Sequence, residues 1–246
     1  MTTDHEAIKF DICCAARLLY RQGLSVANAG HLSVAVGPGE MLVNHFGPSF
    51  ATLRPENVVR VGFDGRVLDG AAYVNDTIRL HGIIHRENPR ALAVAHTHPP
   101  SVVTLSALRV VPEIYDQEGC LLADDVGLVE DDYEGLAAEE ERVMPVADAL
   151  RGKPVVILPN HGAITTGDSI QVALLRMLLL ESMAARHLAV ARAARDLGRE
   201  PVAIAPSAAR RAKAEIARIP VLPLLWKDFL ARLRATDPDL FEGREN

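Results

Sequence analysis

The sequence has few cysteines and no long apolar run. Its three cysteines are the adjacent Cys13 and Cys14 and the remote Cys120, a spacing that fits neither a disulfide framework nor a CxxC zinc motif. No stretch of about eighteen apolar residues occurs, so a membrane-spanning helix is excluded. The polar, acidic N-terminus lacks the basic and then apolar order of a secretory signal. We therefore expect a cytoplasmic protein without a membrane partner.

An excess of positive charge is missing as well. The net charge is −6, from 26 Lys and Arg against 32 Asp and Glu. Binding to nucleic acid relies on clustered basic side chains, so no nucleic acid partner is expected. The hydrophobic content of 49% is enough for a full core, and neither an internal repeat nor a low-complexity linker divides the chain. We expect residues 1–246 to form a single domain that includes a C-terminal helical segment over about 200–246.

Apolar residues recur with the period of a helix in some stretches and alternate as in strands in others. The first helix is expected over 6–22, closed by Gly23. Further helices are predicted over 76–88, 101–108, 143–150, 168–197 and 226–233. Strands are predicted over 31–36, 40–44, 58–63, 91–98, 110–115, 154–158 and 163–167. Asp64-Gly65 predicts a hairpin turn, and the acidic stretch 124–141 predicts a mostly exposed loop.

Two histidines stand at the end of the apolar run 91–98. Side chains two positions apart share one face of a strand, so His96 and His98 can reach one metal ion side by side. The prolines that follow stop the strand and place both side chains at its end. The same pair also fits two hydrogen-bonded histidines at the end of a half-buried strand, without a metal.

His161 supplies a third imidazole in a similar place. It follows the predicted strand 154–158 and precedes Gly162, although this stretch on its own favours a simple turn. Three histidines at strand ends, with a coordination position left open, fit a catalytic zinc ion or a related divalent ion, manganese or iron. A structural zinc site would need four ligands, usually with cysteine. The sequence therefore predicts a divalent metal cofactor held by His96, His98 and His161.

Three separated stretches, in this order, resemble the class II aldolase/adducin family. They are Asn28-Ala-Gly-His-Leu-Ser-Val34, the segment from His81 to His98 with its His-Thr-His ending, and Leu158-Pro-Asn-His-Gly162. The resemblance covers about residues 6–200, and the family includes fuculose-phosphate aldolase, ribulose-phosphate 4-epimerase and metal-dependent decarboxylases. It implies an α/β fold of three layers, α/β/α, with a central, largely antiparallel sheet. It also implies that the three histidines bind the metal, in a homo-oligomer, usually a tetramer, with sites near subunit interfaces.

The residues around the predicted metal site depart from the aldolase pattern. Where the sugar-phosphate aldolases have a glutamate that serves as acid and base, and the epimerases an aspartate, this chain has Thr77. A threonine hydroxyl does not take up a proton at neutral pH as a carboxylate does. The adjacent Asp76 is a candidate for that role, although one helical step turns a side chain by about 100°. Asp116, beside Tyr115, matches the family's tyrosine proton donor, and His31 is the third candidate catalytic residue.

The phosphate-binding residues of the sugar-phosphate members are replaced too. Phe46 offers no hydrogen-bond donor, and a carboxylate at Asp76 would repel a phosphate dianion, so a phosphorylated sugar is not expected. The Gly-His-x-Ser-Val stretch that begins at Gly30 looks like the decarboxylase branch of the family. His45 is a further possible donor, Arg79 equally fits a structural role, and His81 and His85 fit packing or support of the site. The candidate substrate-binding residues are Asn28, Gly30, Asn44, Thr77, Arg79 and Tyr115.

We expect a divalent-metal-dependent carbon–carbon lyase that acts on a small, non-phosphorylated hydroxy or oxo acid. Decarboxylation and retro-aldol cleavage would both pass through a metal-stabilised enolate. The missing glutamate favours decarboxylation, because loss of carbon dioxide needs no base to deprotonate a hydroxyl, and His31 or Asp116 would reprotonate the enolate. Two alternatives stay open: an iron-dependent oxygenase on the same scaffold, and a non-catalytic assembly protein like adducin, against which the three histidines argue.

Overall fold

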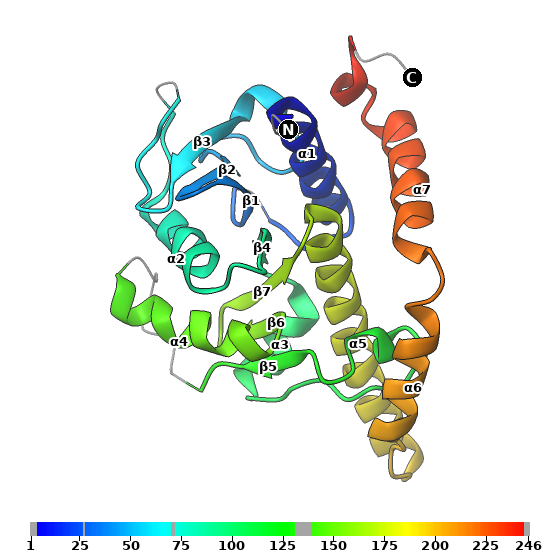
Figure 1. Ribbon diagram of the computed structural model, residues 1–246. Coiled ribbons are helices and arrows are strands. Elements are labelled where there is room, and N and C mark those ends of the chain that lie inside the picture. The colour runs from blue at the N-terminus through cyan, green and yellow to red at the C-terminus, as the bar shows by residue number, and fades with distance from the viewer. Residues whose placement is uncertain (1–3, 27, 70–71, 131–138, 244–246) are drawn as a thin grey trace.

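The computed structural model describes residues 4–26, 28–69, 72–130 and 139–243 (Figure 1). The strands of these segments are β1 His31–Gly37, β2 Glu40–Asn44, β3 Val58–Gly62, β4 Ala93–Thr97, β5 Val126–Leu128, β6 Val155–Leu158 and β7 Gly162–Gly167. They form one seven-stranded sheet in the order β3-β2-β1-β4-β7-β6-β5. Every neighbouring pair is antiparallel except β5 and β6, which run parallel.

Helices cover both faces of this sheet (Figure 1). In the described segments they are α1 His5–Arg21, α2 Arg79–Glu87, α3 Pro100–Ala107, α4 Glu140–Gly152, α5 Ile170–Leu197, α6 Pro206–Ile216 and α7 Val221–Thr236. The larger hydrophobic core lies between one face of the sheet and α1, α3 and α5. A second core lies between the other face and α2 and α4. The expected three-layer α/β/α fold with a largely antiparallel sheet is therefore the one observed.

The long helix α5 ends where the sequence predicts and begins two residues later, at Ile170. The hydroxyl of Ser169 accepts a hydrogen bond from the backbone N–H of Val172, which caps the first turn. Gly198 closes the helix in the left-handed conformation, with φ of 61°, which favours glycine. None of the helices in the described part of the chain has both the length and the apolar content that crossing a membrane requires.

The prediction of a strand over 110–115 was wrong. This segment joins no ladder of the described sheet, and Pro112 within it has no N–H to donate to a neighbouring strand. The N–H of Val110 donates a hydrogen bond to the carbonyl of Leu105. The carbonyl of Ile114 accepts a hydrogen bond from the N–H of Ile204, which connects the segment to the region before α6. Its apolar side chains pack without sheet pairing.

Part of the predicted loop 124–141 is ordered secondary structure. β5 forms the edge of the sheet beside β6, and α4 begins at Glu140, three residues earlier than the predicted start of that helix. The remainder of this prediction, 131–138, lies outside the described residues. The other differences are smaller. The predicted helix 76–88 begins with a 3₁₀ turn over Asp76–Ile78. After the predicted hairpin turn, β3 is paired only by a single bridge between Val61 and Val67. The predicted C-terminal helix is longer than expected, and α6 precedes it.

A buried ion pair connects the residues just after α7 to α1. Arg17 is 4% exposed and donates to Asp237 at 3.1 Å, just after α7, and to Asp239 at 2.8 Å. Arg21 also donates to Asp237, at 2.6 Å. The helical C-terminal segment is therefore in contact with the first helix. The prediction of a single domain stays a prediction.

Candidate metal centre

The sheet order brings the three histidine motifs to one edge. In an antiparallel sheet the start of one strand lies beside the end of its neighbour. β4 therefore ends between the beginning of β1 and the beginning of β7, where His96 pairs in register with His31 on one side and Ile164 on the other. His161 directly precedes β7. The predicted pair and the predicted third histidine thus meet although they are far apart in sequence.

His96, His98 and His161 form a compact triad. Their ring centroids lie 4.9 to 5.0 Å apart, and one ligand nitrogen from each lies within 4.8 Å of the others. The Nδ1 of His96 donates to the carbonyl of Ala163 at 3.0 Å, which leaves Nε2 as the free lone pair. The buried Nε2 of His98 has no hydrogen-bond partner among the described residues. The triad is therefore suited to bind a cation.

Burial keeps these imidazoles in the neutral form that a metal needs. Desolvation, followed by the charge of His98, lowers the pKa of His161 to about 4. Desolvation also lowers the pKa of His98, and that of His96 well below its usual value. Neutral imidazole nitrogens are ligands for zinc, manganese and iron, so the donor set fits a divalent ion of this kind.

Close backbone packing at the triad requires glycine at two positions. A Cβ on Gly162 would lie 2.3 Å from the carbonyl oxygen of Thr97 and 2.8 Å from the ring of His98. Gly30 has φ of +113°, and a Cβ there would lie 2.9 Å from the carbonyl oxygen of His96. The loops that carry His31 and His161 can therefore approach β4 only because these residues lack a side chain.

An acidic residue on α5 holds the loop that follows His98. The carboxylate of Glu181 accepts hydrogen bonds from the backbone N–H groups of Ser101 and Val102, at 3.0 to 3.1 Å. These groups belong to the first turn of α3, where N–H groups have no partner within the helix and a negative charge is favourable. Sequence reasoning did not find Glu181, because no local pattern relates it to a helix about eighty positions earlier.

A cavity of about 340 Å³ opens beside the triad. Besides the three histidines it is lined by four of the predicted site residues, Asn28, Gly30, His31 and Thr77, and by Asn75, Phe46 and the apolar Val26, Ala29, Leu80, Val146 and Leu158. The buried Nδ1 of His31 and Oγ1 of Thr77 have no partner within the described segments. Burial lowers the pKa of His31 to about 4, and the charges of His98 and His161 act in the same direction. The lining residues of the described structure include no carboxylate, lysine or arginine.

Other predicted residues support the cavity or lie away from it. The amide of Asn44 accepts from the Leu32 N–H at 2.8 Å and donates to the Gly30 carbonyl at 3.5 Å, so it positions the start of β1. Asp76 and Arg79 are exposed at the beginning of α2 and do not line the cavity. Their predicted roles in catalysis and binding stay untested.

Tyr115 and Asp116 lie outside the cavity of their own chain. The carboxylate of Asp116 accepts from the backbone N–H of Gly119 at 2.8 Å and from Nε of Arg186 at 3.1 Å. The ring of Tyr115 contacts the ring of His187 on α5, with centroids 5.8 Å apart. These two residues therefore link the segment before the 3₁₀ turn at Gly119–Leu122 to α5.

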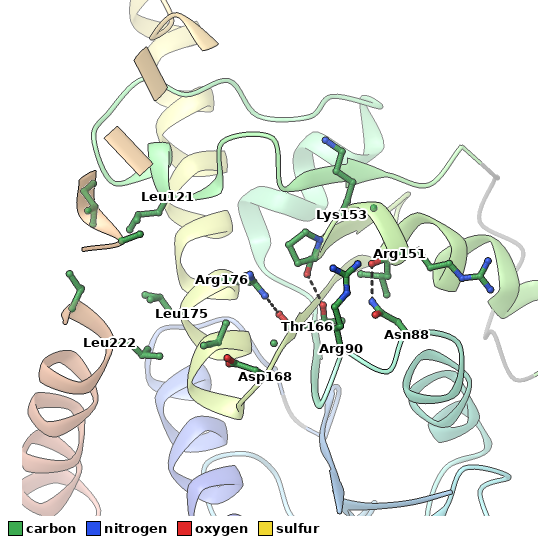
Figure 2. Close-up of a pocket in the computed structure, with 18 of the residues that line it drawn as sticks. Asn88, Arg90, Leu121, Arg151, Lys153, Thr166, Asp168, Leu175, Arg176 and Leu222 are labelled. Atoms are coloured by element: carbon green, nitrogen blue, oxygen red, sulfur yellow. Dashed lines mark hydrogen bonds between the residues drawn. The ribbon is translucent and has the colours of Figure 1, made fainter. Parts of the chain in front are cut away.

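A larger cavity, of about 810 Å³, lies elsewhere (Figure 2). It is bounded by the ends of α2 and α4, by β7 and α5, and by the start of α7, and its basic residues are Arg90, Arg151, Lys153 and Arg176. Figure 2 shows the guanidinium of Arg176 donating to the carbonyl of Thr166. None of its lining residues is a histidine. The smaller cavity, which the three histidines line, is therefore the candidate functional site.

Comparison with known proteins agrees with this geometry. The family model described as Class II Aldolase and Adducin N-terminal domain matches residues 10–188. The chain belongs to this family. A crystal structure of an aldolase II superfamily protein from Pseudomonas syringae superposes with a TM-score of 0.85 at 24% identity, covering 98% of this chain and 97% of that one. At this identity the likeness shows the shared fold.

Several relatives have named activities. The 3,4-dihydroxyphthalate decarboxylase of Rhodococcus jostii (strain RHA1) is 30% identical over 200 residues, which cover 76% of this chain and 82% of that protein. The 4-hydroxy-3-prenylphenylpyruvate oxygenase/4-hydroxy-3-prenylbenzoate synthase of Streptomyces roseochromogenus subsp. oscitans is 30% identical over 186 residues, 73% of this chain and 66% of that protein.

Proposed function

We propose that this class II aldolase family member is a divalent-metal-dependent lyase that decarboxylates a small hydroxy-aromatic acid. One observation carries the proposal: the cavity beside the triad presents His31 and Thr77 and, within the described structure, no carboxylate base. The sugar-phosphate aldolases that this chain resembles rely on a carboxylate base to deprotonate a substrate hydroxyl. Loss of carbon dioxide needs no such deprotonation, so the cavity suits decarboxylation better than aldol cleavage.

The three histidines would hold the metal and leave coordination positions open for substrate. The orphaned Nε2 of His98 and the fixed tautomer of His96 support this ligand set. A divalent ion bound there would act as a Lewis acid toward a substrate oxygen. Zinc is the first expectation for three imidazoles, and manganese and iron are the alternatives, because selectivity among them depends on geometry and supply.

The cavity favours a small substrate with an apolar body. Its volume of about 340 Å³ lies near the lower end of the range, about 300–1,000 Å³, of small-molecule sites. Phe46, Leu80 and Val146 offer apolar contacts for a ring. Because its described lining has no lysine or arginine, a phosphate dianion would find no cationic side chain beside the metal ion. The lack of a cationic side chain also destabilises an ionised substrate carboxylate in the cavity, which favours its loss as neutral carbon dioxide.

His31 is placed to move the proton that the reaction needs. In the proposed step the substrate hydroxyl keeps its proton, so no base is needed. The bond between the ring carbon and the carboxylate breaks, carbon dioxide leaves, and the electron pair stays on the ring carbon. His31 then gives a proton to that carbon and takes one from solvent in its place. One proton is consumed in total, and no oxidant or reductant takes part.

The relatives support this choice without deciding it. The Rhodococcus relative is named for decarboxylation of a dihydroxylated aromatic diacid, and a relative from Rhodospirillum rubrum is named as a sugar-phosphate aldolase. Retro-aldol cleavage of a hydroxy or oxo acid is therefore the second lyase reaction to test. Thr77 at the position of the aldolases' glutamate disfavours it.

The test is a product assay on protein loaded separately with zinc, manganese and iron(II). The acids would be 3,4-dihydroxyphthalate, simpler hydroxybenzoates and 4-hydroxy-2-oxo acids, with carbon dioxide and aldehyde measured together. We expect metal-dependent carbon dioxide release that His161→Ala abolishes along with metal binding. Aldehyde without carbon dioxide would select retro-aldol cleavage, and neither product from any acid would overturn the lyase proposal.

An iron-dependent oxygenase is a second candidate, favoured by the name of the Streptomyces relative. Neutral imidazoles with open positions also suit iron(II). Oxygen uptake by the iron-loaded protein, with no turnover under anaerobic conditions, would select it. The third hypothesis, a non-catalytic assembly protein like adducin, would be supported if purified protein bound no metal and His161→Ala changed only the stability of the fold.

The expected homo-oligomer stays a prediction. Tyr115 and Asp116 do not line the cavity of their own chain, so they can act in catalysis only at the site of a neighbouring subunit. The mass of the protein in solution tests this, and a monomer would exclude catalytic roles for both.

A further inference from the structure

The larger cavity, of about 810 Å³, lies at the far end of the strands that carry the triad. β4 and β7 run antiparallel, with Ala93 opposite Gly167 at one end and Thr97 opposite Ala163 at the other. Gly167 lines this cavity, whereas the triad lies at the end of Thr97. A strand rises about 3.4 Å per residue, so the two ends are about 14 Å apart. The larger cavity is therefore separate from the candidate metal centre.

One wall of this cavity is aliphatic. Figure 2 shows Leu121, Leu175 and Leu222 together on the side of α7. None of the lining residues in the described structure is aromatic, so a nucleobase would find no ring to stack on. The wall suits a flexible apolar chain instead. Its side chains come from the 3₁₀ turn before β5, from α5 and from the junction of α6 and α7: Leu121, Val172, Leu175, Ile216, Ile219, Val221 and Leu222.

The opposite wall is basic. Arg90, Arg151 and Lys153 lie across the cavity from the leucines, and Arg176 projects between the two walls (Figure 2). Asp168 is the single carboxylate in the described lining, so the cationic side chains outnumber the anionic ones by four to one. The cavity therefore combines a positive wall with an apolar wall.

Two of the four basic side chains have partners outside the cavity. The guanidinium of Arg151 forms ion pairs with Glu87 at 2.7 Å and with Asp148 at 2.9 Å, so its charge is compensated. The ammonium of Lys153 donates to the backbone carbonyl of Asp124, which leaves its charge unpaired. The positive field of the cavity therefore depends mainly on the remaining two arginines.

Arg90 and Arg176 form no ion pair with a carboxylate of the described structure. Arg90 is exposed, whereas Arg176 is partly buried and donates one hydrogen bond, to the carbonyl of Thr166 (Figure 2). Burial lowers the pKa of Arg176, and the charges of Asp125 and Asp168 act in the opposite direction. A guanidinium has five N–H donors, so an anion in the cavity would satisfy the others and compensate the charge.

The sequence of α5 places charge and apolar surface on one face. Val172, Leu175 and Arg176 are separated by three and four residues, a spacing that puts them side by side on a helix. The intervening Ala173 and Leu174 are buried in the larger hydrophobic core. A single helix face therefore presents both a cation and a hydrocarbon surface to the same cavity.

We propose that this cavity is a second binding site, which takes an organic anion with a single carboxylate and an aliphatic body. Arg90 and Arg176 bind the carboxylate, and the leucine wall binds the chain. Asp168 favours a single negative charge, because it would repel a phosphate dianion more strongly. The volume lies within the range of about 300–1,000 Å³ of small-molecule sites. The site does not depend on which reaction the triad supports.

The first test is calorimetric titration of the metal-free, full-length protein with octanoate. We expect octanoate to bind, and the affinity should rise by about 4-fold for each methylene added from butanoate to octanoate. Octanol lacks the charge and acetate lacks the chain, so both should bind at least about 10-fold more weakly. No binding of octanoate, equal binding of octanol, no dependence on chain length, or tighter binding of octyl phosphate would each overturn the proposal.

Substitutions test the two arginines. Arg90→Gln and Arg176→Gln should each weaken octanoate binding by about 10-fold or more. Arg176→Lys keeps the charge and should retain most of the affinity. Arg192→Gln, on the exposed surface of α5, is the matched control and should change nothing. If Arg176→Gln lowers Tm, the exposed Arg90 decides the outcome, and wild-type affinity in Arg90→Gln would overturn the proposal.

A final comparison separates this site from the triad, which a carboxylate would also reach if a metal ion were bound there. His161→Ala removes a candidate metal ligand and should bind octanoate as tightly as the wild type does. A crystal soaked in octanoate should show the carboxylate beside Arg90 and Arg176. Loss of binding in His161→Ala, or octanoate located at the triad alone, would overturn the proposal.

Discussion

Glu181 and Ser101 are joined by a two-oxygen hydrogen bond, in which the backbone N–H of Ser101 donates to both carboxylate oxygens at 3.0 and 3.1 Å. Because Ser101 follows His98 by three residues, this bond connects the long helix α5 to the first turn of α3, just after a candidate metal ligand. The rigidity of the candidate site therefore depends on an interaction between distant parts of the chain.

Glu181→Ala should weaken metal binding and the fold together. The loss of a charged cap at a helix start costs about 1–2 kcal/mol. Loss of support for a ligand lowers metal affinity by about 10- to 100-fold. Urea unfolding and zinc titration against a chelator measure the two effects. Glu215→Ala, on the exposed surface of α6, is the control and should change neither. Unaltered affinity in Glu181→Ala would contradict the assigned role.

Gly162→Ala should disrupt the triad. The added Cβ would lie 2.3 Å from the carbonyl oxygen of Thr97, so the strand must shift at a cost of about 1–3 kcal/mol. Gly152→Ala, at the end of α4, is the matched control, since a Cβ there meets nothing within 4 Å. Calorimetric titration with zinc and thermal unfolding would compare the variants. Equal affinities for zinc would show that the close approach is unimportant.

Removal of the metal should lower stability by an amount that grows with the logarithm of the metal affinity. An ion present at about 100 times its dissociation constant stabilises the folded state by about 2.7 kcal/mol. Chelation should therefore lower Tm in the wild-type protein but not in His161→Ala, which lacks one ligand. His187→Ala removes an imidazole outside the cavity and should respond as the wild type does. A chelator that leaves the wild-type Tm unchanged would argue against a bound ion.

His85 should make the metal-free protein less stable in mild acid. Its pKa is about 4 in the folded state, against about 6.5 when unfolded, so the unfolded chain binds more protons between these values. Stability is then complete above about pH 7 and falls as pH drops from about 6.5 to 4, by up to ~3 kcal/mol for this residue. Urea unfolding at a series of pH values measures the slope. His85→Gln should reduce it by about one proton, and an unchanged slope would exclude His85 as its source.

Asp237→Ala should destabilise the contact between the C-terminal segment and α1. It leaves Arg17, 4% exposed, with only its partner Asp239 and the Leu53 carbonyl, and removal of one member of a buried pair costs about 3 kcal/mol. Asp228→Ala breaks the exposed pair with Arg232 on α7 and should cost less than about 1 kcal/mol. Urea unfolding compares them, and similar losses would contradict the buried role of Asp237.

The sequence predicted the elements whose signals are local. Most helices and strands with a clear apolar period are observed within a few residues of their expected positions. The strand 110–115 failed because composition alone does not show whether a partner strand exists. β5 was missed because a three-residue edge strand has too little length for a pattern. The roles of Glu181 and Asn44 were missed, because each depends on a partner outside its own helix or strand.

The sequence by itself determined the three histidines, the family resemblance and the replacement of the aldolase glutamate by Thr77, because these are properties of residue type and spacing. Only the tertiary structure decided which candidates share a cavity. The antiparallel order of β1, β4 and β7 places Asn28, Gly30, His31 and Thr77 beside the triad, and it leaves Asp76, Arg79 and Asp116 outside. Proximity across a sheet depends on strand order and register, and no local pattern in the chain specifies either.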